Sequence, residues 1–323
     1  MTTADVLPQL TAKIRAAAHP DPAAPCACGT TTLADRPDTT VLRHAETVAK
    51  AHAPGTDPAA LALRLATASL LPDVFLAPLA PTPATLAGAR PVTLWPYGAP
   101  IDPEGDPAEA PWEAAASLLA RLHRTPPPPG TPAMRGPAKA AHAMARLRET
   151  LAASPPHPAA PPVLRAWSAL PGWARAEAPM PGIPALCHGD LHLGQLVRHP
   201  APDGPWRLID VDDLGVGVPA WDLARPASWY ACGLLPPEDW TRFLTAYRAA
   251  GGPAVPEDGD PWPALDVPAR ALTVQTSARY LAKAIAADRP LDPPQQVEAF
   301  GVGEGERGPE VRSELRGRAV PPA

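Results

Sequence analysis

The chain has 323 residues, of which 46% are hydrophobic and 19% charged, and its formal net charge is -5. This length favours two lobes or domains over one small core, and the mild negative charge provides no basic surface for nucleic acid. No stretch is apolar for long enough to cross a bilayer, and the N-terminus lacks the apolar run of a signal peptide. We therefore expect a cytoplasmic protein that binds neither nucleic acid nor membrane. The sequence carries no signal for its oligomeric state.

Four cysteines are scattered along the chain, at Cys26, Cys28, Cys187 and Cys232. No pair of them has the spacing of a zinc finger, and Cys26 and Cys28 are too close together to indicate a disulfide framework. We expect free thiols in a reducing compartment.

The first part of the chain is predicted to form a helix, a small sheet and a second helix. Apolar residues recur at helical spacing over residues 3–18. Three short runs rich in Thr and Val, separated by turn-like gaps, predict an antiparallel sheet over residues 29–52. Asp57 is placed to cap a helix over residues 58–71. Residues 91–100 then form a further strand and a hinge.

The second part of the chain is predicted to be mainly helical. Long apolar patterns indicate helices over residues 111–123, 136–152, 237–250 and 264–286. Two proline-rich stretches, residues 125–132 and 154–162, are interpreted as surface linkers without regular structure. From residue 288 the chain has few apolar residues, which predicts a disordered tail to residue 323. We expect an α+β protein with lobes over residues 1–95 and 96–287.

Two motifs place acids where buried strands meet loops. The first is CHGDLHLGQLV, residues 187–197, and the second is LIDVDD, residues 208–213. Phosphoryl transfer from ATP requires a carboxylate for the attacking hydroxyl, followed five residues later by an amide that helps to hold magnesium. Asp190 and Gln195 have this spacing, and Asp210 ends the next apolar strand, where a second metal ligand is needed.

A lysine from the small lobe is also needed to contact the nucleotide phosphates. The chain has three lysines before residue 200, and only Lys50 falls on a predicted strand. Lys13 and Lys139 fall on predicted helices, which makes Lys50 the candidate.

These two motifs resemble those of the aminoglycoside phosphotransferase family, whose kin include choline, homoserine and fructosamine kinases. The resemblance rests on HGDLHLGQLV and on LIDVDDLGVGVPAWDLA, and more weakly on LLARLH at residues 118–123. It implies a two-lobed, protein-kinase-like fold with a small antiparallel-sheet N-terminal lobe and a mainly helical C-terminal lobe. It also implies transfer of the γ-phosphate of ATP, with GTP left open, to a hydroxyl of a small molecule.

The resemblance implies roles for eight residues. Asp190 is the catalytic base, Gln195 and Asp210 hold Mg²⁺, and Lys50 contacts the nucleotide. The supporting residues are His188, which braces the loop, His192, Asp212, and Asp222, which bonds backbone near the catalytic loop.

The chain departs from the family pattern at three places. Gln replaces Asn at residue 195, which moves the amide oxygen one methylene further out and makes the demanding octahedral geometry of Mg²⁺ harder to reach. The helix after Lys50 contains no acid to pair with it, which leaves Asp57, Asp73, Glu46 or no residue as the partner. The turn between the first two strands, residues 36–38, is short and lacks glycine, which is poor evidence for a phosphate-covering loop.

Two alternatives stay open. The departures are also consistent with a kinase-like nucleotide-binding protein that is catalytically weak or inactive. The His188-x-Asp190-x-His192 pattern is compatible with a metal hydrolase, since His and Asp bind zinc, although the sequence offers no further strand-end histidine. The remaining acid of the second motif, Asp213, is interpreted as a surface residue, and His123 as a packed core histidine.

Overall fold

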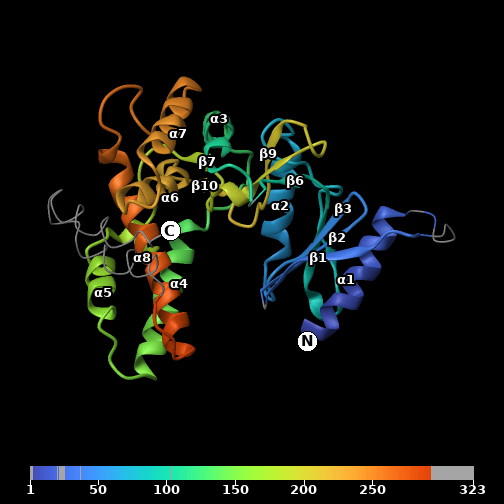
Figure 1. The fold of residues 1–323 in the computed structure, drawn as a ribbon, viewed down its shortest axis with the longest axis horizontal. Helices are drawn as coiled ribbons and strands as arrows, with labels where there is room; N and C mark the ends of the chain where they lie inside the picture. Colours follow the sequence, from blue (N-terminus) through green and yellow to red (C-terminus); the bar gives the residue numbers. More distant parts are fainter. Residues whose placement is uncertain (1–2, 20, 22–25, 37, 103, 292–323) are drawn as a thin grey trace. The chain divides into compact units, whose positions relative to one another are not determined.

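The computed structural model describes residues 3–19, 21, 26–36, 38–102 and 104–291 (Figure 1). The chain divides into two compact units. The first unit comprises Met1–Pro111, Pro127–Pro132 and Leu193–Asp212, and the second comprises Trp112–Pro126, Ala133–His192 and Asp213–Ala323. Because the units alternate along the chain, the limits expected for the lobes stay a prediction. Residues 292–323 of the expected tail lie outside the described residues.

The first unit is built on a five-stranded antiparallel sheet of order β1-β2-β3-β5-β4 (Figure 1). Its strands are β1 (Thr30–Arg36), β2 (Thr39–His44), β3 (Thr47–Ala51), β4 (Ala84–Thr85) and β5 (Pro91–Pro96). The small sheet expected over residues 29–52 is therefore confirmed, and β5 adds the strand expected after residue 91.

Helix α1 (Thr3–Ala18) covers one face of this sheet. Its fully buried Leu10 and Ile14 pack in a core with Ala49 and Ala51 of β3. Because side chains alternate along a strand, Lys50 lies on the opposite face of β3 from these alanines. The amphipathic helix expected at the N-terminus is confirmed. It covers one face of the sheet, and Lys50 lies on the other face.

The rest of the first unit consists of short elements. Helix α2 (Pro58–Ser69) begins as expected at Asp57, whose Oδ1 accepts a hydrogen bond of 2.9 Å from the N–H of Ala59. A three-stranded antiparallel sheet, in the order β6-β8-β9, contains the expected hairpin after the first motif. These strands are β6 (Ala99–Pro100), β8 (Leu196–Arg198) and β9 (Trp206–Leu208), and the short 3₁₀ turns are η1 (Ala87–Ala89), η2 (Pro107–Glu109) and η4 (Leu193–Gln195).

The second unit is mainly helical. Its helices are α3 (Trp112–Arg124), α4 (Gly136–Ala152), α5 (Ala160–Ser168), α6 (Ala220–Ala231), α7 (Pro237–Ala249) and α8 (Trp262–Ala286), with one 3₁₀ turn, η3 (Gly172–Arg175). Strands β7 (Ala185–Cys187) and β10 (Gly215–Gly217) form an antiparallel pair. The core contains buried side chains from α4, α5, α6 and α8, among them Met144, Trp167, Trp221 and Leu281.

One linker was assigned wrongly from the sequence. The proline-rich stretch 154–162 was expected to lack regular structure, but α5 begins at Ala160 and has proline in its first turn. Proline is tolerated there because the first N–H groups of a helix have no intrahelical partner. Side chains of Val163 and Trp167 then bury the helix in the core.

The described helices include no segment with the length and apolar character that spanning a bilayer requires.

Candidate active site

The HGD sequence forms a loop at the end of β7 in the second unit. Asp222, in the first turn of α6, is 1% exposed and accepts hydrogen bonds from two backbone N–H groups of this loop. The N–H of His188 lies 2.6 Å from its Oδ2, and that of Gly189 lies 2.7 Å from its Oδ1. Its Oδ2 is also 3.0 Å from Nε2 of His123, which is buried as expected and whose Nδ1 lies 2.8 Å from the hydroxyl of Tyr247. A buried carboxylate thus fixes the backbone immediately before Asp190.

Glycine is required at residue 189. Its φ is +87°, in the left-handed region that L side chains rarely adopt. A Cβ atom there would lie 2.5 Å from the carbonyl oxygen of Asp213. The loop therefore passes close to the end of the second motif, which brings Asp190 and Asp213 into one group.

Two cations hold the side chain of Asp190. Nζ of Lys139 lies 2.7 Å from Oδ2, and an Nη atom of Arg225 lies 2.5 Å from Oδ1. Burial alone would raise the pKa of Asp190, but the charges of Lys139 and Arg225 outweigh it and hold the pKa well below its usual value. Arg225 also donates to the carbonyl oxygen of Leu191, at 3.0 Å. Asp190 is thus ionised and oriented at neutral pH.

Lys139 also contacts Asp213, at 2.6 Å. The side chain of Asp213 is only 8% exposed, so its interpretation as a surface acid is wrong. Burial raises the pKa of Asp213 above its usual value, although the charge of Lys139 opposes the shift. Asp213 is buried because Lys139 of α4 and the loop at Gly189 lie against it, and the local sequence did not indicate these tertiary contacts.

Lys139 and Arg225 were not recognised from the sequence. Lys139 was set aside because it lies on a helix, yet α4 carries it to Asp190. Arg225 directly follows the WDLA sequence and is three positions after Asp222 on α6. Residues at this spacing lie near the same face of a helix, so the sequence could have indicated that Arg225 lies near the loop that Asp222 holds.

A second group of charges lies in the first unit, around Lys50. Its Nζ lies 2.7 Å from Asp210 Oδ1 and 3.0 Å from Asp212 Oδ2. Burial alone would lower the pKa of Lys50, but the charges of Asp210 and Asp212 outweigh it and raise the pKa above its usual value. Lys50 therefore does have carboxylate partners, and they come from the second motif.

None of the three acids suggested from the sequence pairs with Lys50. Asp57 caps α2, Asp73 lies 3.6 Å from Arg207, and Glu46 lies 3.2 Å from Arg43. Each of these acids has a local role in its own segment.

His52 joins the same group and was also missed. Its Nδ1 lies 2.8 Å from Asp212 Oδ1, and its Nε2 lies 2.8 Å from the hydroxyl of Thr93. Burial alone would raise the pKa of Asp212, but Lys50 and His52 hold it well below its usual value. The signal was strand alternation, because His52 follows Lys50 by two residues and so points to the same side of the chain.

Gln195 and Asp210 lie together in the first unit. Gln195 ends η4 and is 8% exposed, and its side-chain nitrogen is 3.5 Å from Asp210 Oδ2. The N–H of Ile209 donates to the backbone oxygen of Gln195, at 2.9 Å, which holds the two segments together. Asp210 has a φ of +65°, a conformation uncommon outside glycine that aspartate tolerates better than most residues. Such strain is often found at functional sites.

The donor atoms of this group suit magnesium. Asp210 provides two carboxylate oxygens, and the amide of Gln195 provides a third oxygen. Mg²⁺ is a hard cation that prefers oxygen ligands. These residues fit the ion, and the cation of Lys50 beside them suits the phosphates that accompany it.

The two histidines of the first motif do not form a metal site. His188 is fully buried, and its Nδ1 lies 3.4 Å from the backbone N–H of Asp190. The charge of His192 lowers the pKa of Asp190 as well, by less than the charges of Lys139 and Arg225 do. Among the described residues, neither group of converging metal-ligand side chains includes His188, Asp190 or His192. This geometry gives no support to the hydrolase alternative.

Comparison with known proteins places these motifs in a family context. The model of the phosphotransferase enzyme family matches residues 30–266. A streptomycin 6-kinase from Streptomyces griseus is 39% identical over 110 residues, which are 33% of this chain and 32% of that enzyme. The chain thus spans about a third of the length of the curated relative that it matches.

Two solved structures resemble the chain over most of its length. One is the GDP and kanamycin complex of APH(2'')-IIIa, with a TM-score of 0.57 and 13% identity, covering 96% of this chain and 99% of that one. The other is a spectinomycin phosphotransferase in complex with ADP and spectinomycin, with a TM-score of 0.56 and 14% identity, covering 88% and 91%. The α+β, kinase-like fold predicted from the sequence, with a small N-terminal antiparallel sheet and a helical C-terminal part, is confirmed.

Proposed function

The chain belongs to the phosphotransferase enzyme family, and we propose that it transfers the γ-phosphate of a nucleoside triphosphate to a hydroxyl of a small molecule. The observation that carries the proposal is the ion pair between Lys50 and Asp210, which are 160 residues apart in the sequence and lie 2.7 Å apart in the structure. This pair brings together the lysine and the acid that phosphoryl transfer requires. Asp190, fixed in its own loop, supplies the remaining carboxylate.

Asp190 acts on the acceptor. Its lowered pKa keeps it ionised at neutral pH, so that it accepts a hydrogen bond from the attacking hydroxyl. It takes up the proton as the new P–O bond forms and the bond from the γ-phosphorus to the bridging oxygen breaks, which releases the nucleoside diphosphate. A carboxylate of low pKa is a weak base, but phosphoryl transfer through a loose transition state depends more on positioning the nucleophile than on early proton removal. Lys139 and Arg225 supply that positioning, because each holds one carboxylate oxygen.

Lys50, Asp210 and Gln195 act on the nucleotide. Lys50 contacts the phosphates, and Asp210 and Gln195 hold Mg²⁺, with Asp212 keeping Lys50 and His52 in place. When bound, Mg²⁺ neutralises charge on the phosphates of the nucleotide. Lys50 is pre-oriented for its role, because two carboxylates hold its Nζ on the face of β3 opposite α1.

The relatives suggest the acceptor class. Their names and titles refer to streptomycin, kanamycin and spectinomycin. We propose an aminoglycoside or a related aminocyclitol as the acceptor. ATP is the proposed donor, with GTP as the competing one, since the two structural neighbours contain ADP and GDP respectively.

The test is a transfer assay with both donors. The protein is incubated with magnesium, with ATP or GTP, and with each of the three antibiotics, and the acceptor is analysed by mass spectrometry for the added phosphate. Asp210→Asn should abolish transfer, because it removes the negative charge that would attract Mg²⁺ and that pairs with Lys50. Asp203→Asn is the matched control, since Asp203 is exposed in the hairpin turn of the same unit, and it should leave transfer unchanged. Equal activity of Asp210→Asn and the wild type would refute the proposed role.

A second candidate is a nucleotide-binding protein that is catalytically weak or inactive. Gln195 favours it, because the longer side chain sets the amide oxygen further from the backbone than asparagine would. In that case the protein would bind nucleotide with magnesium, and neither the wild type nor Gln195→Asn would phosphorylate any acceptor. A gain of transfer in Gln195→Asn would instead identify a weakened enzyme.

A further inference from the structure

Four side chains with metal-binding atoms converge at one end of the sheet in the first unit, away from the Lys50 group. They are His19, Cys26, Cys28 and His44, and their ligand atoms all lie within 4.8 Å of one another. Two histidines and two cysteines are the donor set of many tetrahedral zinc sites. The proposed phosphotransferase activity uses none of these residues.

The distances between the ligand atoms are close to those of a tetrahedral site. The Nε2 atoms of His19 and His44 lie 3.2 Å apart, and the Sγ of Cys26 lies 3.0 Å from the first and 3.3 Å from the second. With Zn–N of about 2.05 Å and Zn–S of about 2.3 Å, tetrahedral angles give edges of about 3.3 Å between nitrogens and about 3.6 Å between nitrogen and sulfur. The observed edges are shorter than these by about 0.1 to 0.6 Å, so small shifts of the side chains would admit an ion.

The two imidazole rings present these nitrogens edge to edge. They are nearly perpendicular, at 89°, with centroids 5.2 Å apart. His44 is fully buried at the end of β2, and His19 directly follows α1. Two rings from different elements thus direct the same atom, Nε2, toward one point.

Neighbouring polar groups contact two of the four ligands, His44 and Cys26, in ways that favour metal binding. Nδ1 of His44 lies 2.9 Å from the hydroxyl of Thr30. When Nδ1 carries the proton and donates to that hydroxyl, Nε2 presents a lone pair to the cluster, the arrangement common for zinc-bound histidine. The backbone N–H of Cys28 lies 3.3 Å from the Sγ of Cys26, and such hydrogen bonds stabilise a thiolate because they place positive charge near the sulfur. All four cysteines of the chain are free thiols.

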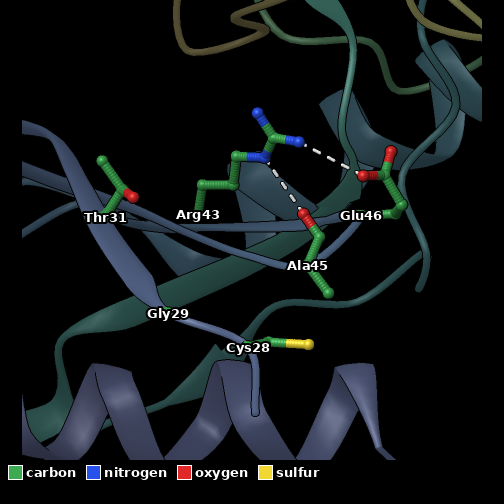
Figure 2. A pocket seen from close by; sticks show the side chains of 6 residues that line it. All are labelled: Cys28, Gly29, Thr31, Arg43, Ala45 and Glu46. Carbon is green, nitrogen blue, oxygen red and sulfur yellow. Dashed lines mark hydrogen bonds and ion pairs between the residues drawn. The ribbon is translucent and has the colours of Figure 1, made fainter.

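A metal can reach the cluster from solvent. Cys28 also lines a pocket with a volume of about 290 Å³. The other lining residues are Gly29, Thr31, Arg43, Ala45 and Glu46, which Figure 2 labels. The wall opposite Cys28 is fixed, because Arg43 donates to the backbone oxygen of Ala45 and to the carboxylate of Glu46. Cys28 is exposed, His19 and Cys26 are half-buried and His44 is buried, so Cys28 forms the accessible side of the cluster and His44 its inner side.

We propose that His19, Cys26, Cys28 and His44 bind one Zn²⁺ ion in a structural Cys₂His₂ site. The ion would join the end of α1 to the end of β2 and to the segment that leads into β1, and would thereby hold the helix on the sheet. Four protein ligands fill the tetrahedron and leave no position for a substrate, as in structural zinc sites. The sequence did not reveal the site because two ligands come from a Cys-x-Cys segment and the others come from a helix end and a strand end.

The proposal is tested by metal binding to the full chain. The reduced, metal-free protein is titrated anaerobically with Co²⁺ as a spectroscopic probe, and then with Zn²⁺. We expect one equivalent of cobalt to give the strong visible bands of a tetrahedral ion together with a thiolate-to-cobalt charge-transfer band, and one equivalent of Zn²⁺ to abolish both. Cobalt spectra without the charge-transfer band, or no binding at all, would overturn the proposal.

Three variants locate the site. Cys28→Ser should lose the charge-transfer intensity of one thiolate and most of the zinc affinity, whereas the matched control Cys232→Ser, in the second unit, should behave as the wild type. Thr30→Val should weaken zinc binding by about 10- to 100-fold while leaving the cobalt spectrum tetrahedral, as expected for loss of a hydrogen bond to a ligand. Equal zinc affinity in the wild type and in Cys28→Ser would show that the ion binds elsewhere and would refute the assignment. Cys28 is exposed, so Cys28→Ser leaves the core intact, and a thermal melt of its metal-free form should match that of the metal-free wild type.

Discussion

Replacement of Lys139 by methionine would remove a cation that contacts both Asp190 and Asp213, and we expect it to destabilise the second unit. Methionine has a helix propensity close to that of lysine, so α4 itself would lose little. Asp190 would keep Arg225 at 2.5 Å. In the described part of the chain, the cation left beside Asp213 would be Arg135, whose nitrogen is 3.7 Å away and whose side chain is 51% exposed. Most of the loss in the free energy of unfolding should therefore come from the uncompensated charge of Asp213.

The size of the effect follows from the burial of the pair. Removing one partner of a buried ion pair typically costs about 3–5 kcal/mol, because a charge is left without compensation. The side chain of Lys139 is 28% exposed and that of Asp213 is 8% exposed, so water can partly reach the vacated position. We expect a loss of about 3 kcal/mol, at the lower end of that range.

The effect should depend on pH. The raised pKa of Asp213 should rise further without Lys139, so that its folded form takes up a proton before its unfolded form does. The variant then gains stability as the pH falls through that pKa. The wild type behaves in the opposite way through Asp190, whose lowered pKa gives stability that is present above its unfolded value and is lost as the pH falls below it. The difference in stability between the two proteins should therefore shrink toward acid.

The assay is urea unfolding of wild type and Lys139→Met, followed by tryptophan fluorescence, at neutral pH and in steps toward acid. Trp167 and Trp221 are buried in the core of the same unit and report its unfolding. The double variant Lys139→Met/Asp213→Asn should recover part of the loss, because it removes the stranded charge. A loss of unfolding free energy below about 1 kcal/mol at neutral pH, as is usual for an exposed pair, would show that Lys139 does not compensate a buried charge on Asp213. A difference between the two proteins that grows toward acid would show the same.

Two further predictions concern the loop and the metal ligand. Asp222→Ala should cost about 3 kcal/mol or more in urea unfolding, because the buried N–H groups of His188 and Gly189 lose a charged acceptor; a loss no larger than that of a surface substitution would contradict this role. Gln195→Asn should raise the transfer rate and lower the magnesium concentration at half-maximal activity in steady-state kinetics, because it restores the shorter amide; an unchanged magnesium dependence would show that Gln195 is not a ligand.

The positions of most helices and strands could be predicted from the sequence, because the patterns that indicate them involve neighbouring residues. The Thr- and Val-rich runs, the helical pattern before them and the Asp57 cap each depend on neighbouring residues, and each element formed where it was expected. Helix α5 was missed because its first turn is rich in proline, and only the burial of Val163 and Trp167 compensates for that. Local composition alone did not contain this information.

In the candidate site, too, residues in local motifs were predicted, and residues placed only by tertiary packing were missed. Lys50 and Asp210 were selected because each falls at a recognisable position in a strand or motif, and the structure brings them together. Lys139, in contrast, reaches Asp190 across 51 residues of sequence through the packing of α4. A contact made only by tertiary packing leaves no pattern in a single sequence, and the burial of Asp213 was missed for the same reason.

The roles of Asp190 and of the Lys50 group are separated by measuring transfer and nucleotide binding in one preparation of Asp190→Asn. Transfer of γ-phosphate to the acceptor is measured beside the affinity for MgATP by calorimetry, and a thermal melt confirms the fold. We expect the variant to bind MgATP as the wild type does and to transfer no phosphate, because Asp190 serves the acceptor while Lys50 and Asp210 serve the nucleotide. A variant that transfers phosphate at the wild-type rate would contradict this assignment of roles.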